Sequence, residues 1–451
     1  MHSATKEGKK NRAKRKAKMV IAAAGFALAV FAYAPAPIMF DTPAADEKGV
    51  MVLGNGEVGA TAWLDAAGTL HTVLQNSDSW NEGGRHVKTG AIDYETKSPV
   101  DAGTYRQELS LERGEFEAAW KCGGRAVTLR YRIQQETDSI AVCDVKGAPD
   151  VEAKVVSWRL YPGGSKEFST AKQSCRNELG NLFDGMTKNG RPITFTISAD
   201  RLVPGGWCHV NRNDTVAKMM KYYDHYQATG DLGKADLLSN RVFGGVTRKM
   251  AGKAASRTLF LAAITCLHPC KDEAEWLRRT NEMLDRDGWT IDGEEAKREA
   301  HIAWWRTFWS RSHIDVTPSE TANNAPRSSA VTLADECAAI TRCYAAQRYV
   351  NACAGRGRLP IRFNGSLFTV SHNGDPDYHR WGHGYWWQNT RLPYYTMFAS
   401  GDLDMLQPLF DMYLGLLDFN MKRTRKYLGH GGAYFPECIQ PWTTGVRSQK
   451  E

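Results

Sequence analysis

Residues 377–395 gather side chains that are suited to binding a polyhydroxylated ligand. The candidate contacts are Trp381, His383, Trp386, Trp387, Gln388, Asn389 and Arg391. Aromatic rings stack on the C–H faces of sugar rings, while amide, imidazole and guanidinium groups bind the hydroxyls. The alternative is a helix whose aromatic side belongs to the core. Because many polar donors stand beside the aromatic residues, we interpret the segment as a carbohydrate-binding cleft.

Glu437 is the best candidate for a catalytic acid. It follows Phe435 and Pro436 in a loop rich in Gly and Pro, with Tyr434 and Trp442 nearby. Such apolar surroundings favour the protonated carboxyl group that a general acid needs. Cleavage of a glycosidic bond generally takes two carboxyl groups. The alternative interpretation of Glu437 is a solvated loop carboxylate.

Four aspartates are weaker candidates for the second carboxyl group. Asp375 and Asp377 occur in Asn-Gly-Asp-Pro-Asp, which first of all indicates a turn. Asp402 is a good helix N-cap and Asp404 follows it, so both are most simply interpreted as helix-start residues.

Two glycine-containing stretches have more than one interpretation. Asn364, in RFNGSLF, belongs either to a substrate-binding loop or to a plain Asn-Gly turn, and both interpretations stand. Gly54, Gly56 and Gly59 match G-x-G-x-x-G, which binds dinucleotides only where a helix follows directly. A turn at 65–68 and then a strand follow here. We therefore expect a tight connection between strands.

The elements that carry these residues change in character near residue 270. Strands are predicted at 69–74, 105–111, 115–121, 127–133, 139–145, 193–197 and 258–264. Short, evenly spaced strands favour an antiparallel sandwich. Helices are predicted at 272–284, 294–312, 333–354 and from Pro408 to about 427. The sequence thus predicts a β-sandwich at 38–270, a helical linker at 271–325 and an all-α domain at 326–451.

The first 34 residues predict a secretory signal peptide. A basic segment at 6–18, with eight Lys and Arg against one Glu, precedes an apolar, Ala-rich stretch at 19–34. An uncleaved anchor is the alternative, but a membrane span takes ~20 residues. We expect a secreted or periplasmic protein without a membrane partner after cleavage. Because this segment supplies most of the formal charge of +8, no nucleic-acid partner is expected.

The ten cysteines show no metal-ligand spacing. Cys266 and Cys270 either form a disulfide or remain free thiols. No metal and no organic cofactor are expected.

Several blocks of the sequence, in order, resemble the six-hairpin glycosidase superfamily, whose catalytic domain is an (α/α)6 toroid. LGNGEVGATAWLD and LQNSDSWNEGGRHVKTG resemble its N-terminal sandwich. AWWRTFWSRS, CAGRGRLPIRFNGSLFTV and DYHRWGHGYWWQNTRLPYY followed by ASGDLDML resemble its helical part. The likeness covers nearly the whole mature chain. It is closest to a bacterial family of unknown function that shares the layout of sandwich and toroid and is distantly similar to alpha-L-fucosidases.

The resemblance implies an inverting glycoside hydrolase, with Glu437 as the acid and a water activated from the opposite side. In related fucosidases a helix presents two asparagines to the substrate. Asn389 falls on one of them and Trp387 replaces the other, so fucose specificity is not implied. Asn364 resembles a loop at the mouth of the toroid. The alternatives are a non-catalytic carbohydrate-binding protein, a glycoside phosphorylase and a polysaccharide lyase on the same fold.

A ring of six helical hairpins needs more helices than residues 326–451 predict. At ordinary helix and loop lengths a hairpin takes ~30–50 residues. In the family that the chain resembles, the ring continues well past the Phe-Pro-Glu loop. We therefore expect a truncated member, with the partner carboxylate of Glu437 in sequence that the chain lacks.

Overall fold

The computed structural model divides the chain into two compact units, Met1–Tyr33 and Ala34–Glu451. The described elements all lie in the second unit, and residues 1–32 of the predicted signal peptide lie outside the described part. None of the described helices has the length and apolar character that a membrane span requires. The structure describes residues 33–137, 139–169, 187–188, 191–192, 194–211, 238, 240–252, 256–319, 331–371, 374–379, 384–441 and 443–444.

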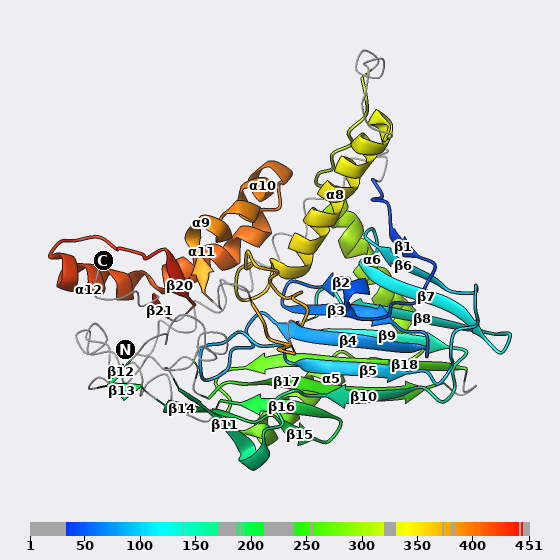
Figure 1. The fold of residues 1–451 in the computed structure, drawn as a ribbon, viewed down its shortest axis with the longest axis horizontal. Helices are drawn as coiled ribbons and strands as arrows, with labels where there is room; N and C mark the ends of the chain where they lie inside the picture. Colours follow the sequence, from blue (N-terminus) through cyan, green and yellow to red (C-terminus); the bar gives the residue numbers. More distant parts are fainter. Residues whose placement is uncertain are drawn as a thin grey trace, which may run out of the picture. The chain divides into compact units, whose positions relative to one another are not determined.

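Two antiparallel sheets form the N-terminal part of the described chain (Figure 1). The larger has the order β1 (Ile38–Phe40), β6 (Arg106–Ser110), β7 (Glu115–Cys122), β8 (Arg125–Ile133), β9 (Ile140–Lys146), β18 (Arg257–Leu267), β17 (Val242–Ala251), β16 (Gly206–Val210), β15 (Arg201–Val203). The smaller has the order β10 (Glu152–Val156), β5 (Gly90–Glu95), β4 (Thr69–Asn76), β3 (Val58–Leu64), β2 (Met51–Gly54). Two short hairpins are β11 (Ser165–Ser169) with β14 (Thr194–Ser198) and β12 (Thr187–Lys188) with β13 (Arg191–Pro192). Short 3-10 turns are η1 (Glu47–Gly49) and η2 (Pro162–Gly164).

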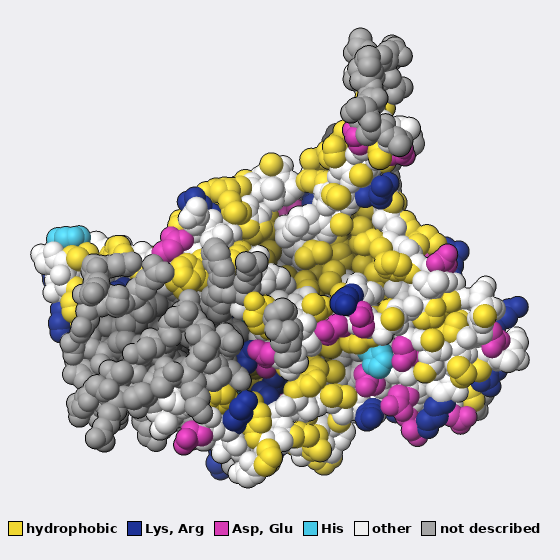
Figure 2. Space-filling view, in the orientation of Figure 1, with side chains coloured by type: hydrophobic (Ala, Val, Ile, Leu, Met, Phe, Trp, Pro, Cys, Tyr) yellow, Lys and Arg dark blue, Asp and Glu magenta, His cyan; other side chains and the backbone are white. Residues whose placement is uncertain are grey.

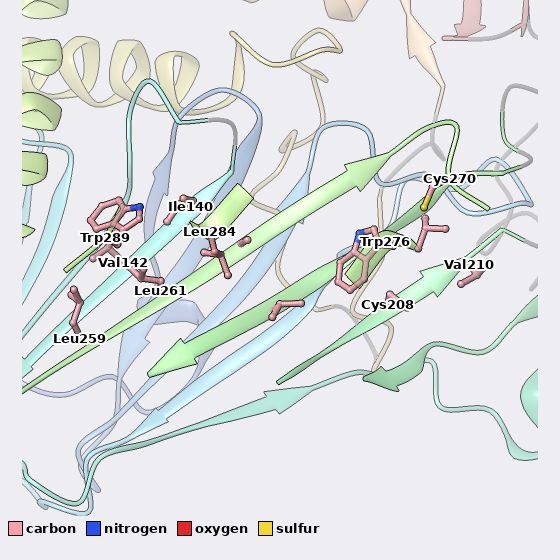
Figure 3. Close-up of a cluster of buried hydrophobic side chains, with 13 residues drawn as sticks. Ile140, Val142, Cys208, Val210, Leu259, Leu261, Cys270, Trp276, Leu284 and Trp289 are labelled. Carbon is pink, nitrogen blue, oxygen red and sulfur yellow. The ribbon is translucent and has the colours of Figure 1, made fainter. Parts of the chain in front are cut away.

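Alternating side chains of β18 contribute to two hydrophobic cores, one on each face of the larger sheet. Phe260 points to the smaller sheet, where its ring lies 5.3 Å from that of Tyr94 on β5. Leu259 and Leu261 point the other way and belong to a buried cluster that includes Trp276 of helix α5 (Glu273–Arg286), shown in Figure 3. Successive side chains of a strand point to opposite faces, so one strand can contribute to both layers. The predicted β-sandwich is confirmed, with α5 covering the outer face of its larger sheet.

Helix α6 (Glu294–Trp309) joins the sandwich to helix α8 (Leu333–Ala354). At its start, Glu294 accepts a hydrogen bond at 2.8 Å from Arg132 of β8. Near its end, the ring of Trp305 stacks at 4.9 Å on Tyr349 of α8. The Tyr349 hydroxyl donates to the carbonyl of Val52 on β2 at 3.1 Å. The helices are therefore packed directly against the sheets.

The chain after α8 is mainly helical, as predicted, but it is not all-α. Its helices are α9 (Trp387–Thr390), α10 (Leu392–Ser400), η4 (Leu403–Leu406), α11 (Gln407–Gly415) and α12 (Leu417–Leu428). A small antiparallel sheet is formed by β19 (Tyr385–Trp386), β20 (Cys438–Gln440) and β21 (Thr443–Thr444). The all-α prediction was wrong here, because strands of two or three residues are too short to show a period of two.

Several helices of this region expose large apolar side chains. Figure 2 shows hydrophobic side chains gathered over α8 and α10. Phe398 on α10 is 58% exposed, and Leu414 on α11 is 65% exposed. A folded domain normally turns such faces inward.

Candidate functional site

Three glycines allow β2, β3 and their turn to pack against the end of α8 and the segment after it. The N–H of Gly56 donates to the carbonyl of Cys353 at 2.9 Å. Gly56 has a φ of +95°, and a Cβ there would approach Arg356 at 2.6 Å. A Cβ on Gly59 would approach Leu367 at 2.6 Å, and one on Gly54 would collide with Cys353. β2 pairs directly with β3, so G-x-G-x-x-G is a β connection, as predicted, and it serves packing.

The loop between β4 and β5, residues 77–89, is fixed to the predicted turn at 375–377. Arg85 forms an ion pair with Asp375. Asp377 accepts from the N–H of Lys88 at 2.7 Å and from Arg159 at 3.0 Å. Burial opposes ionisation of Asp377, but the charges of Arg159 and Arg85 hold its pKa below the ordinary value. Both aspartates therefore connect the sandwich to the helical region.

Asp402 and Asp404 also have arginine partners. Asp402 is buried and occupies the predicted N-cap position, at the start of η4, but its side chain makes no cap hydrogen bond. Its carboxylate is held instead by Arg348 of α8, with two contacts of 2.8 Å, and by the Ser400 hydroxyl at 2.7 Å. Asp404 pairs with Arg311 at 2.7 Å. The Asp402 side chain does not cap the helix because an arginine distant in sequence binds its carboxylate.

Glu437 lies against the start of α9, where the predicted binding residues are found. The N–H of Gln388 donates to Oε1 of Glu437 at 2.9 Å, and the N–H of Trp387 donates to its carbonyl at 2.8 Å. Gln388 and Glu437 are exposed, and Trp387 is 39% exposed. The Trp387 ring meets Tyr413 edge to face at 5.4 Å, and Tyr413 lies 5.2 Å from Phe435. We call Trp387, Gln388, Tyr413, Phe435 and Glu437 the aromatic surface.

The remaining predicted residues lie at varying distances from the aromatic surface. Trp386 is half-buried in β19, directly before Trp387, and Asn389 and Arg391 are half-buried at the end of α9. Asn364 lies half-buried in a loop whose neighbouring Arg362 donates to the carbonyl of Gly384, just before β19. The other two predicted residues, Trp381 and His383, lie outside the described residues.

Sequence reasoning missed Glu57, which lines a cleft of about 720 Å³ between the sandwich and the segment after α8. Its Oε2 accepts from the Ser77 hydroxyl at 2.8 Å and from the N–H of Arg358 at 2.6 Å. Burial and, next, the charge of Asp78 raise the pKa of Glu57 to about 7, although these hydrogen bonds oppose the rise. The sequence signal for this site is the position of Glu57 between Gly56 and Gly59, where a carboxylate occurs inside a glycine-rich turn.

The described residues contain no group of three or more His, Cys, Asp or Glu that could hold a metal ion. Cys266 and Cys270 are free thiols and form no disulfide. Cys266 donates to the carbonyl of Asp78 at 3.1 Å, and burial raises the pKa of its thiol. Cys175 lies outside the described residues.

Comparison with known proteins gives a match to a family model and a similarity to solved structures. Residues 39–263 match the model of a family described as a domain of unknown function (DUF5703), a span from β1 into β18. Among solved structures, the chain is similar to a protein from the human microbiome assigned as a kojibiose phosphorylase, with 8% identity and a TM-score of 0.45. The similarity covers 91% of this chain and 52% of the other, so the chain spans about half the length of that structure. No curated protein matches the chain.

Proposed function

We propose that the chain acts on carbohydrate and that the aromatic surface binds the saccharide. The observation that carries this proposal is the exposed Trp387 ring, backed by Tyr413, at a helix start whose N–H groups contact Glu437. A rigid indole offers an apolar face for the C–H side of a sugar ring. The adjacent carboxylate and the Gln388 amide supply hydrogen-bonding groups for its hydroxyls.

Within this proposal, the chain is an exported glycoside hydrolase and Glu437 is its general acid. In an inverting reaction the acid protonates the leaving glycosidic oxygen while a base on the other side activates water. The base is not one of the four aspartates first considered, since Asp375, Asp377, Asp402 and Asp404 are held by arginines. We place the reaction where β20 approaches the sandwich, since Gln440 donates to the carbonyl of Gly84 at 3.3 Å.

One observation favours a second candidate, a carbohydrate-binding protein without catalysis. Oε1 of Glu437 already accepts from the N–H of Gln388 at the start of α9. That contact satisfies one of the backbone donors that a helix start leaves open, which is a structural task. In this version the carboxylate orients the helix and contacts sugar hydroxyls without transferring a proton.

A glycan-binding screen run beside a reducing-end assay separates the two candidates. The hydrolase predicts release of new reducing ends, and Glu437→Gln then removes turnover while binding persists. The matched control is Glu282→Gln, an exposed position of α5 that should leave turnover unchanged. Binding without turnover supports the second candidate. Absence of any glycan binding contradicts both.

A further inference from the structure

The cleft beside Glu57 is separate from the aromatic surface, none of whose residues lines it. Its volume of about 720 Å³ lies within the range of ~300–1,000 Å³ that is typical of small-molecule sites. Its walls come from the β2–β3 turn, the turn after β8, the end of α5, α6 and residues 356–358. Nothing in the proposed function uses it.

The walls of the cleft are fixed before any ligand arrives. Asn55 donates to the carbonyls of Gln134 and Thr137 at 3.2 and 3.1 Å, which ties the β2–β3 turn to the turn after β8. A Cβ on Gly357 would approach Oε2 of Glu57 at 2.6 Å, so this segment lies directly against the carboxyl group. A preformed site loses less conformational entropy on binding.

Arg356 brings a positive charge to the cleft without a carboxylate partner among the described residues. Its guanidinium lies 3.8 Å from the centre of the Trp304 ring and donates to Gln135 Oε1 at 3.0 Å and to the carbonyl of Ala352 at 3.0 Å. Burial lowers the pKa of Arg356 to about 10. A charge removed from water is costly unless an opposite charge compensates it.

Four buried arginines of the described chain show the usual arrangement. Arg132, Arg159, Arg241 and Arg348 each lie within ion-pair distance of a carboxylate. Arg356 differs from them in facing a cleft, so a ligand can supply the missing negative charge.

The other charges of the lining leave room for an anion. Arg286, at the exposed end of α5, has no ion pair within the described part of the chain. Arg358 is engaged by Asp78 at 2.6 Å. Of the two carboxyl groups, Glu136 is exposed to screening by solvent. Glu57 is the second carboxyl group, and its protonation state determines the net charge of the cleft.

The groups around Glu57 act on its pKa in opposite directions. Burial and the charge of Asp78, on the loop after β4, disfavour the ionised form, whereas the N–H and the charge of Arg358, from the segment after α8, favour it. Cys266 of β18 is a neutral thiol. Burial and Asp78 raise the pKa of Glu57 to about 7. Below that pH Glu57 presents a neutral carboxyl group to the cleft, which Arg356 also lines. Above that pH Glu57 is ionised, and its negative charge, added to that of Glu136, repels an anion.

We infer that this cleft binds a saccharide that carries a carboxylate, with the carboxylate facing Arg356 and Arg286. The carbohydrate part rests on the proposed function, whereas the negative charge follows from the cleft itself. Arg binds carboxylates through a planar pair of N–H donors. Affinity falls as the pH rises from 6 to 8, because Glu57 then ionises.

Calorimetric titration of the full chain with trigalacturonate and with its methyl ester tests the inference. The ester keeps the sugar rings and removes the charge. At pH 6 the acid should bind roughly tenfold more tightly or better, as charge-assisted hydrogen bonds imply. Arg356→Gln and the surface variant Arg286→Gln should each weaken the acid several-fold. Arg278→Gln, on the same helix outside the cleft, is the matched control. Glu57→Gln should keep the affinity at pH 8 equal to that at pH 6.

Equal binding of acid and ester, no binding of either, or an unchanged Arg286→Gln variant would overturn the inference. Tricarballylate carries the same number of carboxylates without sugar rings, so equally tight binding of it would overturn the saccharide part. Trp387→Ala should leave trigalacturonate binding unchanged, and a loss would move the ligand to the aromatic surface. Failure of neutral glycans to bind that surface would contradict the proposed function and leave the cleft result standing.

Discussion

Arg348 of α8 holds both carboxylate oxygens of Asp402, with Nε and Nη2 each 2.8 Å from one of them. The same guanidinium lies 4.1 Å from the centre of the Phe308 ring and donates to the Phe308 carbonyl at 3.1 Å. One buried arginine therefore connects α6, α8 and the turn after α10. This ion pair fixes the turn between α10 and η4 to α6 and α8.

Asp402→Asn should destabilise the fold strongly. Removing one partner leaves the Arg348 charge buried without compensation, which costs about 3–5 kcal/mol in the free energy of unfolding. Asp404→Asn is the matched control, since its side chain is 43% exposed and its pair with Arg311 should contribute about 1 kcal/mol or less. Urea denaturation measures both. Equal, small losses in the two variants would mean that the Arg348 pair does not hold the helices together.

Gly56→Ala should lower the free energy of unfolding more than Gly103→Ala does. Both glycines have positive φ, so each substitution costs about 1–2 kcal/mol in backbone strain. Nothing lies within 4 Å of a Cβ at Gly103, whereas one at Gly56 would approach Arg356 at 2.6 Å. The overpacking adds about 1–3 kcal/mol at Gly56 alone. Thermal denaturation of the two variants should show this difference, and identical melting temperatures would refute the packing of the turn on α8.

The free energy of unfolding should fall as the pH rises from 6.5 to about 9, because His71 loses its proton over this range. Burial opposes protonation of His71, but hydrogen bonds to Asp65 and Asp93 raise its pKa to about 9 from 6.5. The folded state then binds the proton more tightly than the unfolded chain, so this stabilisation is complete below pH 6.5 and disappears towards pH 9. Unfolding free energies at pH 6, 7.5 and 9 should decline less steeply in His71→Gln. An unchanged slope would contradict the assignment.

Two buried histidines should act in the opposite direction. Burial lowers the pKa values of His86 and His301 to about 3, with Arg362 and Arg132 adding to the effect. Both are neutral in the fold, and the unfolded chain takes up protons below pH 6.5, so stability falls as the pH drops from 6.5 towards 3. His301→Gln should reduce the slope of unfolding free energy between pH 4 and 6.5. A slope equal to that of the parent would show that His301 contributes nothing.

The sequence was sufficient for elements with a strong local period and for little that depends on distant partners. Helix α8 has the predicted bounds, 333–354, because its capping residue and terminal glycine are local signals. The pairing of β19 with β20 joins residues about fifty positions apart and was not visible. Glu57 acquires its raised pKa from burial and, next, from the charge of Asp78, neither of which a local pattern encodes. Of the predicted site residues, Trp387, Gln388 and Glu437 are in contact with one another, and their roles stay predictions.

The most direct test of the account is the affinity of a neutral glycan, chosen from the binding screen, for Trp387→Ala. Loss of the stacking platform should weaken binding about tenfold while the melting temperature is unchanged. The control is Tyr427→Ala, an aromatic side chain of α12 that is 46% exposed and outside the aromatic surface, and its affinity should equal that of the parent. Equal affinity of the parent and Trp387→Ala would contradict saccharide binding at the aromatic surface.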